Sequence, residues 1–346
     1  MRCILSFIVA GLLSGCANFT YYVDTINGHY ALLEKSQPID ALLADEVPAE
    51  LREKLENLRQ AREFASRELL LPDNDSYKSY ADIGRPYATW NVIATPRLSV
   101  KPRQWCFLVV GCISYRGYFS KQKAEAYAYQ LQQQGYDTYV TGSRAYSTLG
   151  WFDDPLLNTM MYQSEARRVG ILFHELAHQK LYIEGDSAFN EAFATAIEQE
   201  GIRRWFVSTN KENLVQQYLH DHRRREQFNA LLKTTRARLS DLFKSDKPES
   251  EKLELKKKLF ADLKNNYWEL KKTWSGYSGY DQWMSQDLNN AHLAIVATYH
   301  DLVPGFKRIL EESNYELNAF YKKIEMLITD HESDHRDITQ TLLAHE

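Results

Sequence analysis

Two histidines and a glutamate with metal-binding spacing lie in an apolar stretch of the chain. His174, Glu175 and His178 form the pattern His-Glu-x-x-His between residues 169 and 182. Side chains four positions apart project from one face of a helix, so the two imidazoles can bind one ion. Glu175 can then reach a water on that ion without displacing it, as a general base must. Glu191 follows on a second predicted helix. The pattern predicts one Zn²⁺ with an open position, which is typical of hydrolases.

The chain contains a second copy of the bare pattern, at His331 and His335. The residues between these histidines are polar or charged, which is typical of a solvated helix face or a chain end. The corresponding residues of the first copy include Leu176 and Ala177, so that helix can be buried and can hold its imidazoles in place. We therefore expect only the first copy to bind a metal.

The third ligand depends on how the chain turns between the two helices. Gly185 can end the first helix, and Asp186 or Ser187 can cap the second. An antiparallel return then brings Glu191 level with the histidines. Asp186, eight residues beyond His178, is the competing ligand. We expect Glu191, because Asp186 already has a role as a helix cap.

Other side chains could assist the site. Thr195 or Glu198 could orient a histidine from behind. A second electrophile, often a Tyr or His from elsewhere in the chain, would stabilise the developing oxyanion. Tyr115 and Tyr118 are slightly better placed because they lie in a turn that contains Arg and Gly. For each candidate, an ordinary core or surface position is the more common alternative. The candidates are Tyr115, Tyr118, Tyr299 and His300.

A peptide substrate needs further features around the metal. An exposed strand beside the metal helix could pair with the peptide, and residues 139–151 are its natural source, although an inner strand and turn fit equally well. Removal of an N-terminal residue also requires a carboxylate that holds the α-amine. The available acids are Asp153, Asp154 and Glu165.

The N-terminus has the pattern of an export signal. Arg2 gives a positive start, and the apolar run 4–13 is too short for a comfortable membrane-spanning helix. The following Leu-Ser-Gly-Cys16 resembles the lipobox of bacterial lipoproteins, whose cysteine is lipidated and becomes the first mature residue. A cleaved secretion signal is the alternative. By resemblance to bacterial sorting rules, Ala17 implies retention at the outer membrane, with the protein body in the periplasm.

Cysteine usage agrees with export. Cys106 and Cys112 are the cysteines left in the mature body, and the short segment between them could form a loop or hairpin. A disulfide could close this segment in an oxidising compartment, whereas two free buried thiols are the alternative.

Composition and pattern predict an α+β fold that is mostly helical. With 346 residues, 44% of them hydrophobic and 25% charged, the chain can form one large or two modest globular domains. Its net charge of −4 gives no electrostatic case for nucleic acid, and nothing indicates the oligomeric state. The predicted segments are a signal at 1–15, a helical segment at 16–72, a small sheet region at 73–155, and the zinc-binding and C-terminal helices at 156–346. Residues 73–346 are expected to form one catalytic unit.

The individual elements follow from periodicity and turn residues. We expect strands at 88–94, 105–110 and 138–141, and helices at 211–235 and 252–274. A further helix at 121–134 should end at Gly135.

This order of elements resembles the gluzincin metallopeptidases. Residues 189–195, Phe-Asn-Glu-Ala-Phe-Ala-Thr, resemble the Asn-Glu-Gly-Phe-Ala segment of the aminopeptidases in that group, where the glutamate is the third zinc ligand. The resemblance implies zinc ligands His174, His178 and Glu191 with Glu175 as general base. The interval from the histidines to Glu191 is shorter here than in better-known gluzincins, usually by half a dozen residues or more.

Most of the mature chain also resembles a family of bacterial lipoproteins known as "putative aminopeptidases". The resemblance rests on the lipobox, on residues 111–119 and 150–155, and on Asn289-Asn290 upstream of Tyr299. It implies exopeptidase action. The leading hypothesis is a periplasmic zinc aminopeptidase. The alternatives are a zinc amidase or endopeptidase that acts on cell-wall peptides, and a non-catalytic lipoprotein in which zinc stabilises a partner-binding surface.

Overall fold

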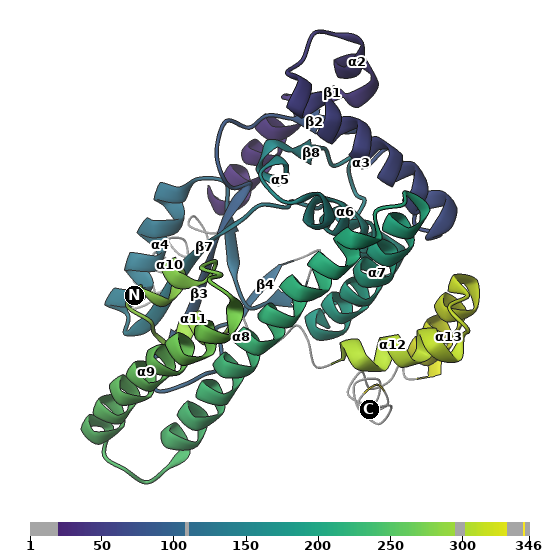
Figure 1. The fold of residues 1–346 in the computed structure, drawn as a ribbon. Helices are drawn as coiled ribbons and strands as arrows, with labels where there is room; N and C mark the ends of the chain where they lie inside the picture. Colours follow the sequence, from purple (N-terminus) through teal and green to yellow (C-terminus); the bar gives the residue numbers. More distant parts are fainter. Residues whose placement is uncertain (1–19, 108–110, 295–301, 331–341, 343–346) are drawn as a thin grey trace.

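Helices α6 (Glu165–Lys180) and α7 (Ser187–Ser208) pack along each other at the centre of the protein (Figure 1). The computed structural model describes residues 20–107, 111–294, 302–330 and 342. Within this part of the chain most residues are helical and three small sheets occur, as predicted for a mostly helical α+β protein. Ser164 caps α6 by accepting a hydrogen bond from the Arg167 amide.

The main core surrounds these two helices. Helix α3 (Ala49–Glu68) packs its apolar face, which includes Leu55 and Leu58, against α6. Helix α12 (Val303–Glu312) contributes Phe306, which packs edge-on against Phe189 of α7, and α13 (Leu317–Asp330) joins the same core. Segments from both ends of the described chain therefore support the central helix pair.

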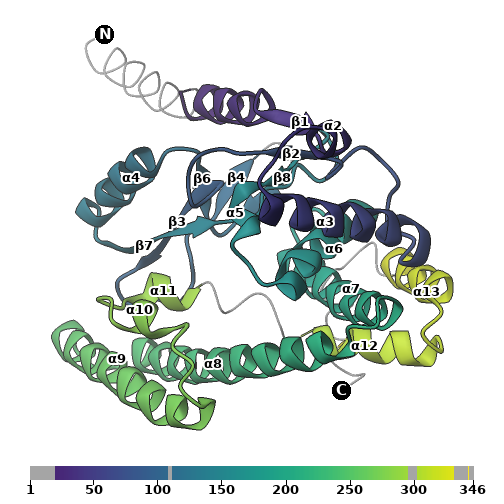
Figure 2. The same cartoon turned by 45° about the horizontal axis from the view of Figure 1, so that its top comes forward.

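A three-stranded antiparallel sheet flanks this helical core (Figure 2). The central strand is β3 (Thr89–Pro96), with β6 (Arg116–Tyr118) on one side and β7 (Tyr136–Ser143) on the other. Alternate residues of β3 face opposite ways. Val92 and Ala94 pack against α4 (Lys121–Gln133), whereas Ile93 meets α11 (Asn290–Ala294). The expected helix before Gly135 and the strands around residues 88–94 and 138–141 are confirmed.

Two smaller sheets complete the β structure. Strand β2 (Ser79–Ala81) pairs with β1 (Ser36–Pro38) antiparallel and with β8 (Leu156–Leu157) parallel, so it links the N-terminal segment to the start of the metal-helix region. Two short helices adjoin this sheet, α2 (Ile39–Ala44) and α5 (Asn158–Met161).

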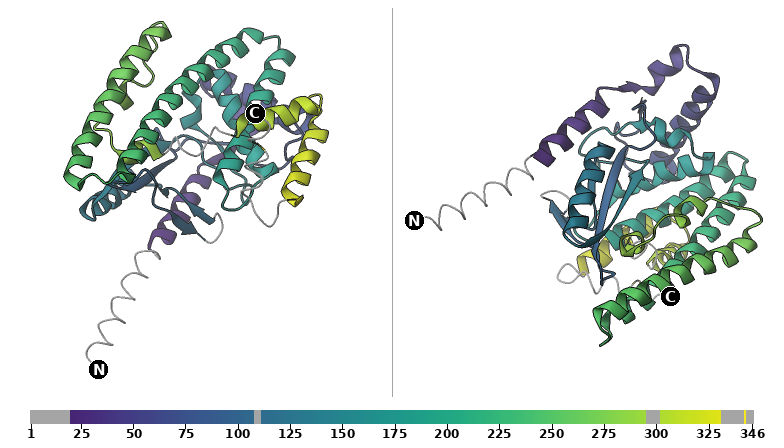
Figure 3. Two further views of the ribbon diagram at one scale, coloured as in Figure 1. Left: turned by 90° about the horizontal axis from the view of Figure 1, so that it is seen from below. Right: turned by 90° about the vertical axis from the view of Figure 1, so that its left-hand side faces the viewer.

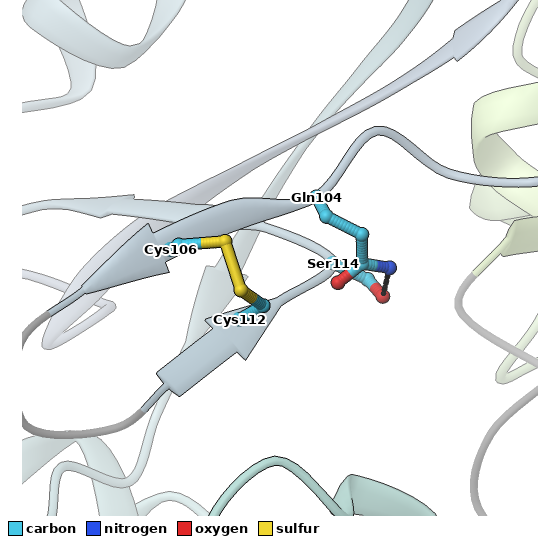
Figure 4. Close-up of a disulfide and its surroundings, with 4 residues drawn as sticks. All are labelled: Gln104, Cys106, Cys112 and Ser114. Carbon is cyan, nitrogen blue, oxygen red and sulfur yellow. Dashed lines mark hydrogen bonds between the residues drawn. A yellow bond between two sulfur atoms is a disulfide. The ribbon is translucent and has the colours of Figure 1, made fainter.

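The third sheet is a hairpin of β4 (Trp105–Phe107) and β5 (Gly111–Ile113) (Figure 4). Cys106 and Cys112 face each other across it and are joined by a disulfide. Just beyond the strands, Gln104 donates a hydrogen bond of 2.8 Å to the Ser114 hydroxyl. The two strands of the hairpin are thus joined by a disulfide and, at the open end, by a side-chain hydrogen bond.

A long helical hairpin packs below the sheet in Figure 2 and in the right-hand view of Figure 3. It consists of α8 (Glu212–Lys244), which is longer than predicted, and α9 (Glu249–Lys271), which begins and ends three residues earlier than predicted. A 3-10 turn (Lys272–Trp274) and α10 (Asp281–Met284) follow. Its own apolar core includes Leu232, Leu239 and Leu263. An ion pair between Lys256 and Asp137 attaches α9 to strand β7.

Residues 20–33 form a helix on the opposite side of the sheet from α8 and α9 (Figures 2 and 3). The ring of Tyr21 on this helix lies 3.9 Å from the guanidinium carbon of Arg116, which is a close cation–π contact. No helix in the described part of the chain combines the length and the apolar character needed to span a membrane.

Candidate metal centre

Three side chains of the helix pair converge on one point. The Nε2 atoms of His174 and His178 are 3.2 Å apart. Glu191 directs Oε2 toward His174 Nε2 at 3.3 Å and Oε1 toward His178 Nε2 at 3.6 Å. One ligand atom from each residue lies within 4.8 Å of the others. The short return from α6 to α7 thus brings Glu191 level with the two histidines.

The geometry and charge of this group fit a divalent ion. Bonds of 2.0–2.1 Å in a tetrahedral site place ligand atoms about 3.3 Å apart, close to the separations seen here. Burial lowers the pKa of His174, but hydrogen bonds and charges from Glu191 and Glu198 outweigh it and raise that pKa to about 10. Burial also lowers the pKa of His178 to about 4. The site therefore favours positive charge and offers a neutral imidazole as a ligand.

The turn between the helices differs from the one expected. Helix α6 ends at Lys180, where Leu181 becomes extended, so Gly185 does not end it as predicted. Gly185 instead has a φ of +80° within the connection, a conformation that glycine adopts without strain. Asp186 caps α7 by accepting a hydrogen bond of 3.0 Å from the Phe189 amide and is not part of the metal group.

Asn190 fixes this turn from inside. Its Oδ1 accepts a hydrogen bond from the Ile183 amide at 2.8 Å, and its Nδ2 donates to the Ile183 carbonyl at 2.7 Å. Asn190 is buried, so both ends of its amide are satisfied by the turn itself. Asn190 therefore stabilises the connection between α6 and α7 in the conformation that places the Glu191 carboxylate beside the two histidines.

Glu198 lies behind the metal ligands. Its Oε2 is 3.2 Å from His174 Nδ1, and its Oε1 accepts hydrogen bonds from Arg167 at 3.1 Å and Tyr218 at 3.3 Å. Burial raises the pKa of Glu198, but the hydrogen bond with His174 and the charge of Arg167 hold it well below its usual value. An ionised carboxylate at this place orients the His174 ring and leaves Nε2 for a metal. Thr195, the other predicted candidate, lines the adjacent cavity.

Glu175 lies next to the candidate metal group. It lines the open space beside His174 and Glu191 and is partly buried. Burial raises the pKa of Glu175 to about 7, with the nearby charge of His174 acting in the opposite direction. A carboxylate with such a pKa can accept and return a proton near neutral pH.

Two cavities meet at these residues. The first has a volume of about 740 Å³ and the second about 680 Å³. His174, Glu175 and Glu191 line both. The first cavity extends toward α8 and the loop after β7. The second extends toward the N-terminal helix and the disulfide hairpin, and its aromatic lining was not predicted. Its aromatic residues are Tyr21, Tyr22, Phe107, Tyr115, Phe119, Tyr146 and Tyr182.

The four oxyanion candidates do not all reach this space. Tyr115 lines both cavities, and burial raises its pKa, with the charges of Glu191 and Tyr182 next in importance. Tyr118 lines neither cavity, because its ring packs against Tyr21 at 5.4 Å between centroids. Tyr299 and His300 lie outside the described residues, as do Cys16 and the second histidine pair at 331 and 335.

Tyr182 is an aromatic residue of the site that the sequence reasoning missed. Its ring centroid is 6.4 Å from that of His178, and it lines the second cavity. Tyr182 lies two residues beyond the end of α6, so its place in the cavity depends on the extended connection and not on helix spacing, and the sequence carried no signal for it.

The three acids considered for binding an α-amine lie elsewhere. Asp153 is exposed, Asp154 is buried against Thr148, and Glu165 bonds to Asn57 and Lys211. None of these three acids is among the described residues that line the two cavities. Residues 141–145, at the end of β7, do line the first cavity, and within the described sheet β7 is an edge strand.

Comparison with known proteins identifies the family. The model of the family described as "Putative aminopeptidase" matches residues 20–338, and the chain belongs to this family. No curated protein and no solved structure matches the chain.

Proposed function

We propose that this protein is a zinc-dependent peptidase and, in keeping with its family, an aminopeptidase. In this proposal His174, His178 and Glu191 hold the ion and Glu175 is the general base. The observation that carries it is the convergence of two imidazoles and one carboxylate: the two Nε2 atoms are 3.2 Å apart, and each lies 3.3 or 3.6 Å from one of the two Glu191 oxygens, separations that suit one ion.

The side chains around this point have complementary roles. Zinc, when bound, supplies the positive charge that makes water more acidic and a peptide carbonyl more electrophilic. Glu175 accepts a proton from the attacking water and passes it to the leaving amine. Glu198 holds the His174 ring through Nδ1. Tyr115 keeps its phenolic proton because burial raises its pKa, so it can donate a hydrogen bond to the developing oxyanion.

Replacement of the base tests this proposal. Glu175→Gln keeps the shape of the side chain but cannot accept the proton, so we expect bound zinc to be retained and peptide hydrolysis to fall about 100- to 10,000-fold. Metal analysis and turnover of a set of unblocked peptides measure the two quantities. Glu184 is exposed in the connection between α6 and α7. Glu184→Gln is therefore the matched control and should retain both bound zinc and peptide hydrolysis. Equal activity of Glu175→Gln and the wild type would eliminate the proposed base.

The proposal also includes a lipid anchor on Cys16 that tethers the protein to the outer membrane, facing the periplasm. It is supported by the Leu-Ser-Gly-Cys pattern and by the disulfide, which is a bond typical of an oxidising compartment. Incorporation of a labelled fatty acid into the full chain, and its loss in Cys16→Ser, would test the anchor. An unlabelled wild-type protein would exclude it.

A further inference from the structure

The first cavity contains a group of positive charges that the proposed hydrolysis does not use. Arg144, Arg167 and Arg225 all line it, together with His174 and Glu175. The three arginines come from different parts of the fold. Arg144 follows strand β7, Arg167 lies in the first turns of α6, and Arg225 lies on α8. Three guanidinium groups therefore border the space beside the metal ligands.

Two of these arginines form no ion pair with any carboxylate in the part of the chain that the structure describes. Arg167 donates to Glu198 at 3.1 Å, so its charge is partly neutralised. Arg144 lies over the ring of Tyr87, 5.2 Å from its centroid, which supports the guanidinium without neutralising it. Among the residues that the structure describes, no carboxylate lies within ion-pair distance of Arg144 or Arg225. The charge of Arg225 acts on Glu198 without an ion pair, so both guanidinium groups keep donors for a ligand.

The acids of the same cavity are already engaged. Of the described residues, the carboxylates that line it are Glu175, Glu191 and Glu198, which the proposed function assigns to proton transfer, metal binding and ring orientation. A divalent ion added to three arginines and three carboxylates leaves the cavity with a net positive charge. A free α-amine would be repelled there, whereas a carboxylate would be attracted.

The second cavity differs in chemistry. None of its described lining residues is an arginine or lysine, and seven of them are Tyr or Phe. A peptide that spans the metal would therefore have an apolar environment on one side and a cationic one on the other. Asn229, one turn beyond Arg225 on α8, adds a neutral hydrogen-bonding group to the cationic side.

We propose that Arg144 and Arg225, with Arg167 beside them, bind a carboxylate of the peptide substrate in the first cavity. This inference rests on the proposed peptidase function and specifies its substrate class: peptides that carry a carboxylate on one side of the cleaved bond. Arginine suits this task because its planar group presents paired donors that match the two oxygens of a carboxylate. The carboxylate can come from the C-terminus of a short peptide or from an acidic side chain.

A matched set of peptides distinguishes these two sources. The set shares one cleavable bond and ends in a free carboxylate, in an amide, in an amide preceded by Glu, or in an amide preceded by Gln. With the zinc-loaded full chain we expect kcat/KM to be at least about 10-fold higher for a carboxylate-bearing peptide than for its neutral partner, since charge-assisted hydrogen bonds are strong. A preference for the free C-terminus alone identifies the terminal carboxylate, and a preference for Glu over Gln identifies the side chain.

Variants assign the preference to the arginines. Arg225→Gln and Arg144→Gln should each raise KM for the favoured peptide about 10-fold with little change in kcat, because the group binds away from the reacting bond. The neutral peptides should be unaffected. Arg223→Gln, two residues earlier on α8 and exposed, is the control and should behave as the wild type.

Binding separates failure of this inference from failure of the proposed function. Calorimetry with zinc-loaded Glu175→Gln measures affinity for the four peptides without turnover. Hydrolysis of all four peptides with equal rates and equal affinities would overturn the carboxylate site and leave the peptidase intact. The opposite result is also possible, in which the protein binds carboxylate-bearing peptides selectively, Arg225→Gln abolishes this selectivity, and the wild type hydrolyses no peptide. That result would support the carboxylate site and overturn the proposed peptidase function.

Discussion

Glu198 Oε2 lies 3.2 Å from His174 Nδ1, although the two residues are 24 positions apart on successive helices. The contact joins α6 to α7 directly behind the candidate metal ligands. It places a negative charge at Nδ1 of the imidazole and leaves Nε2 for the proposed ion, which is the usual support of a metal-binding histidine.

Loss of this support should weaken the site without removing a ligand. We expect Glu198→Gln and Glu198→Ala to lower zinc affinity about 10- to 100-fold, the range typical of such outer partners. Competition with a chelating dye measures the change. Tyr218→Phe removes only one hydrogen bond to Glu198 and should have a smaller effect. Unchanged affinity in Glu198→Ala would show that the His174 ring is held by other contacts.

Gly170 should be required because Glu198 occupies the space beside it. A Cβ at position 170 would lie 2.9 Å from Glu198 Oε1, which displaces the carboxylate from His174. Gly201 lies at the same helix interface, but a Cβ there would meet Phe173 and Leu69. Both alanine variants should lower the free energy of unfolding by about 1–3 kcal/mol through overpacking. Only Gly170→Ala should also weaken zinc binding, as measured by urea unfolding beside chelator competition.

The two candidate third ligands can be separated by substitution. Glu191→Ala removes a ligand and should lower zinc affinity by more than the loss of an outer partner does, beyond about 100-fold. Asp186→Asn should leave affinity unchanged, because asparagine caps a helix as well as aspartate does. Metal titration of the two purified variants gives the answer. The opposite order of effects would make Asp186 the ligand.

Asp154 should make stability depend on pH. It is fully buried, and burial raises its pKa to about 6 although hydrogen bonds from the Thr148 amide and hydroxyl oppose the shift. The folded protein therefore holds this proton more tightly than the unfolded chain, whose carboxyl has a pKa of about 3.9. As pH rises from about 4 to 6 the unfolded chain loses its proton first, so stability falls, by roughly 3 kcal/mol for a shift of this size.

Comparison with an uncharged residue isolates this contribution. In Asp154→Asn the fall between pH 4 and 6 should be smaller, because only the contribution of Glu175, whose pKa is also raised, remains, while the exposed neighbouring variant Asp153→Asn should retain the full fall. Urea unfolding of the three proteins across this pH range measures the difference. A parallel loss of stability in the wild type and in Asp154→Asn would show that Asp154 is not the group that titrates.

The features that local spacing controls were predicted from the sequence. The histidine pair lies on one helix because four residues make about one turn, and α4 ends just before Gly135, whose φ of +84° suits a glycine. The same reasoning failed at Gly185, because Leu181 had already left the helical conformation four residues earlier. A glycine signals that the chain can turn, but it does not show whether the helix has ended before it.

Features that depend on long-range packing were not predicted. Arg144, Arg167 and Arg225 come from a loop and two helices, and only the tertiary fold brings them to one cavity. Tyr115 and Tyr118 had equal standing in the sequence. The structure separates them because Tyr115 precedes strand β6 and faces the metal site, whereas Tyr118 ends that strand and packs outside both cavities.

The bond between Cys106 and Cys112 braces only one side of the cleft. Phe107 and Ile113 of the braced hairpin form part of the aromatic wall, whereas the metal ligands are held by the packing of α6 against α7. Gly111 of the same hairpin lies against Glu184 and Gly185 in the connection between the two helices. We therefore expect reduction of this bond to loosen the cavity wall first and to reach the candidate metal ligands only through that connection.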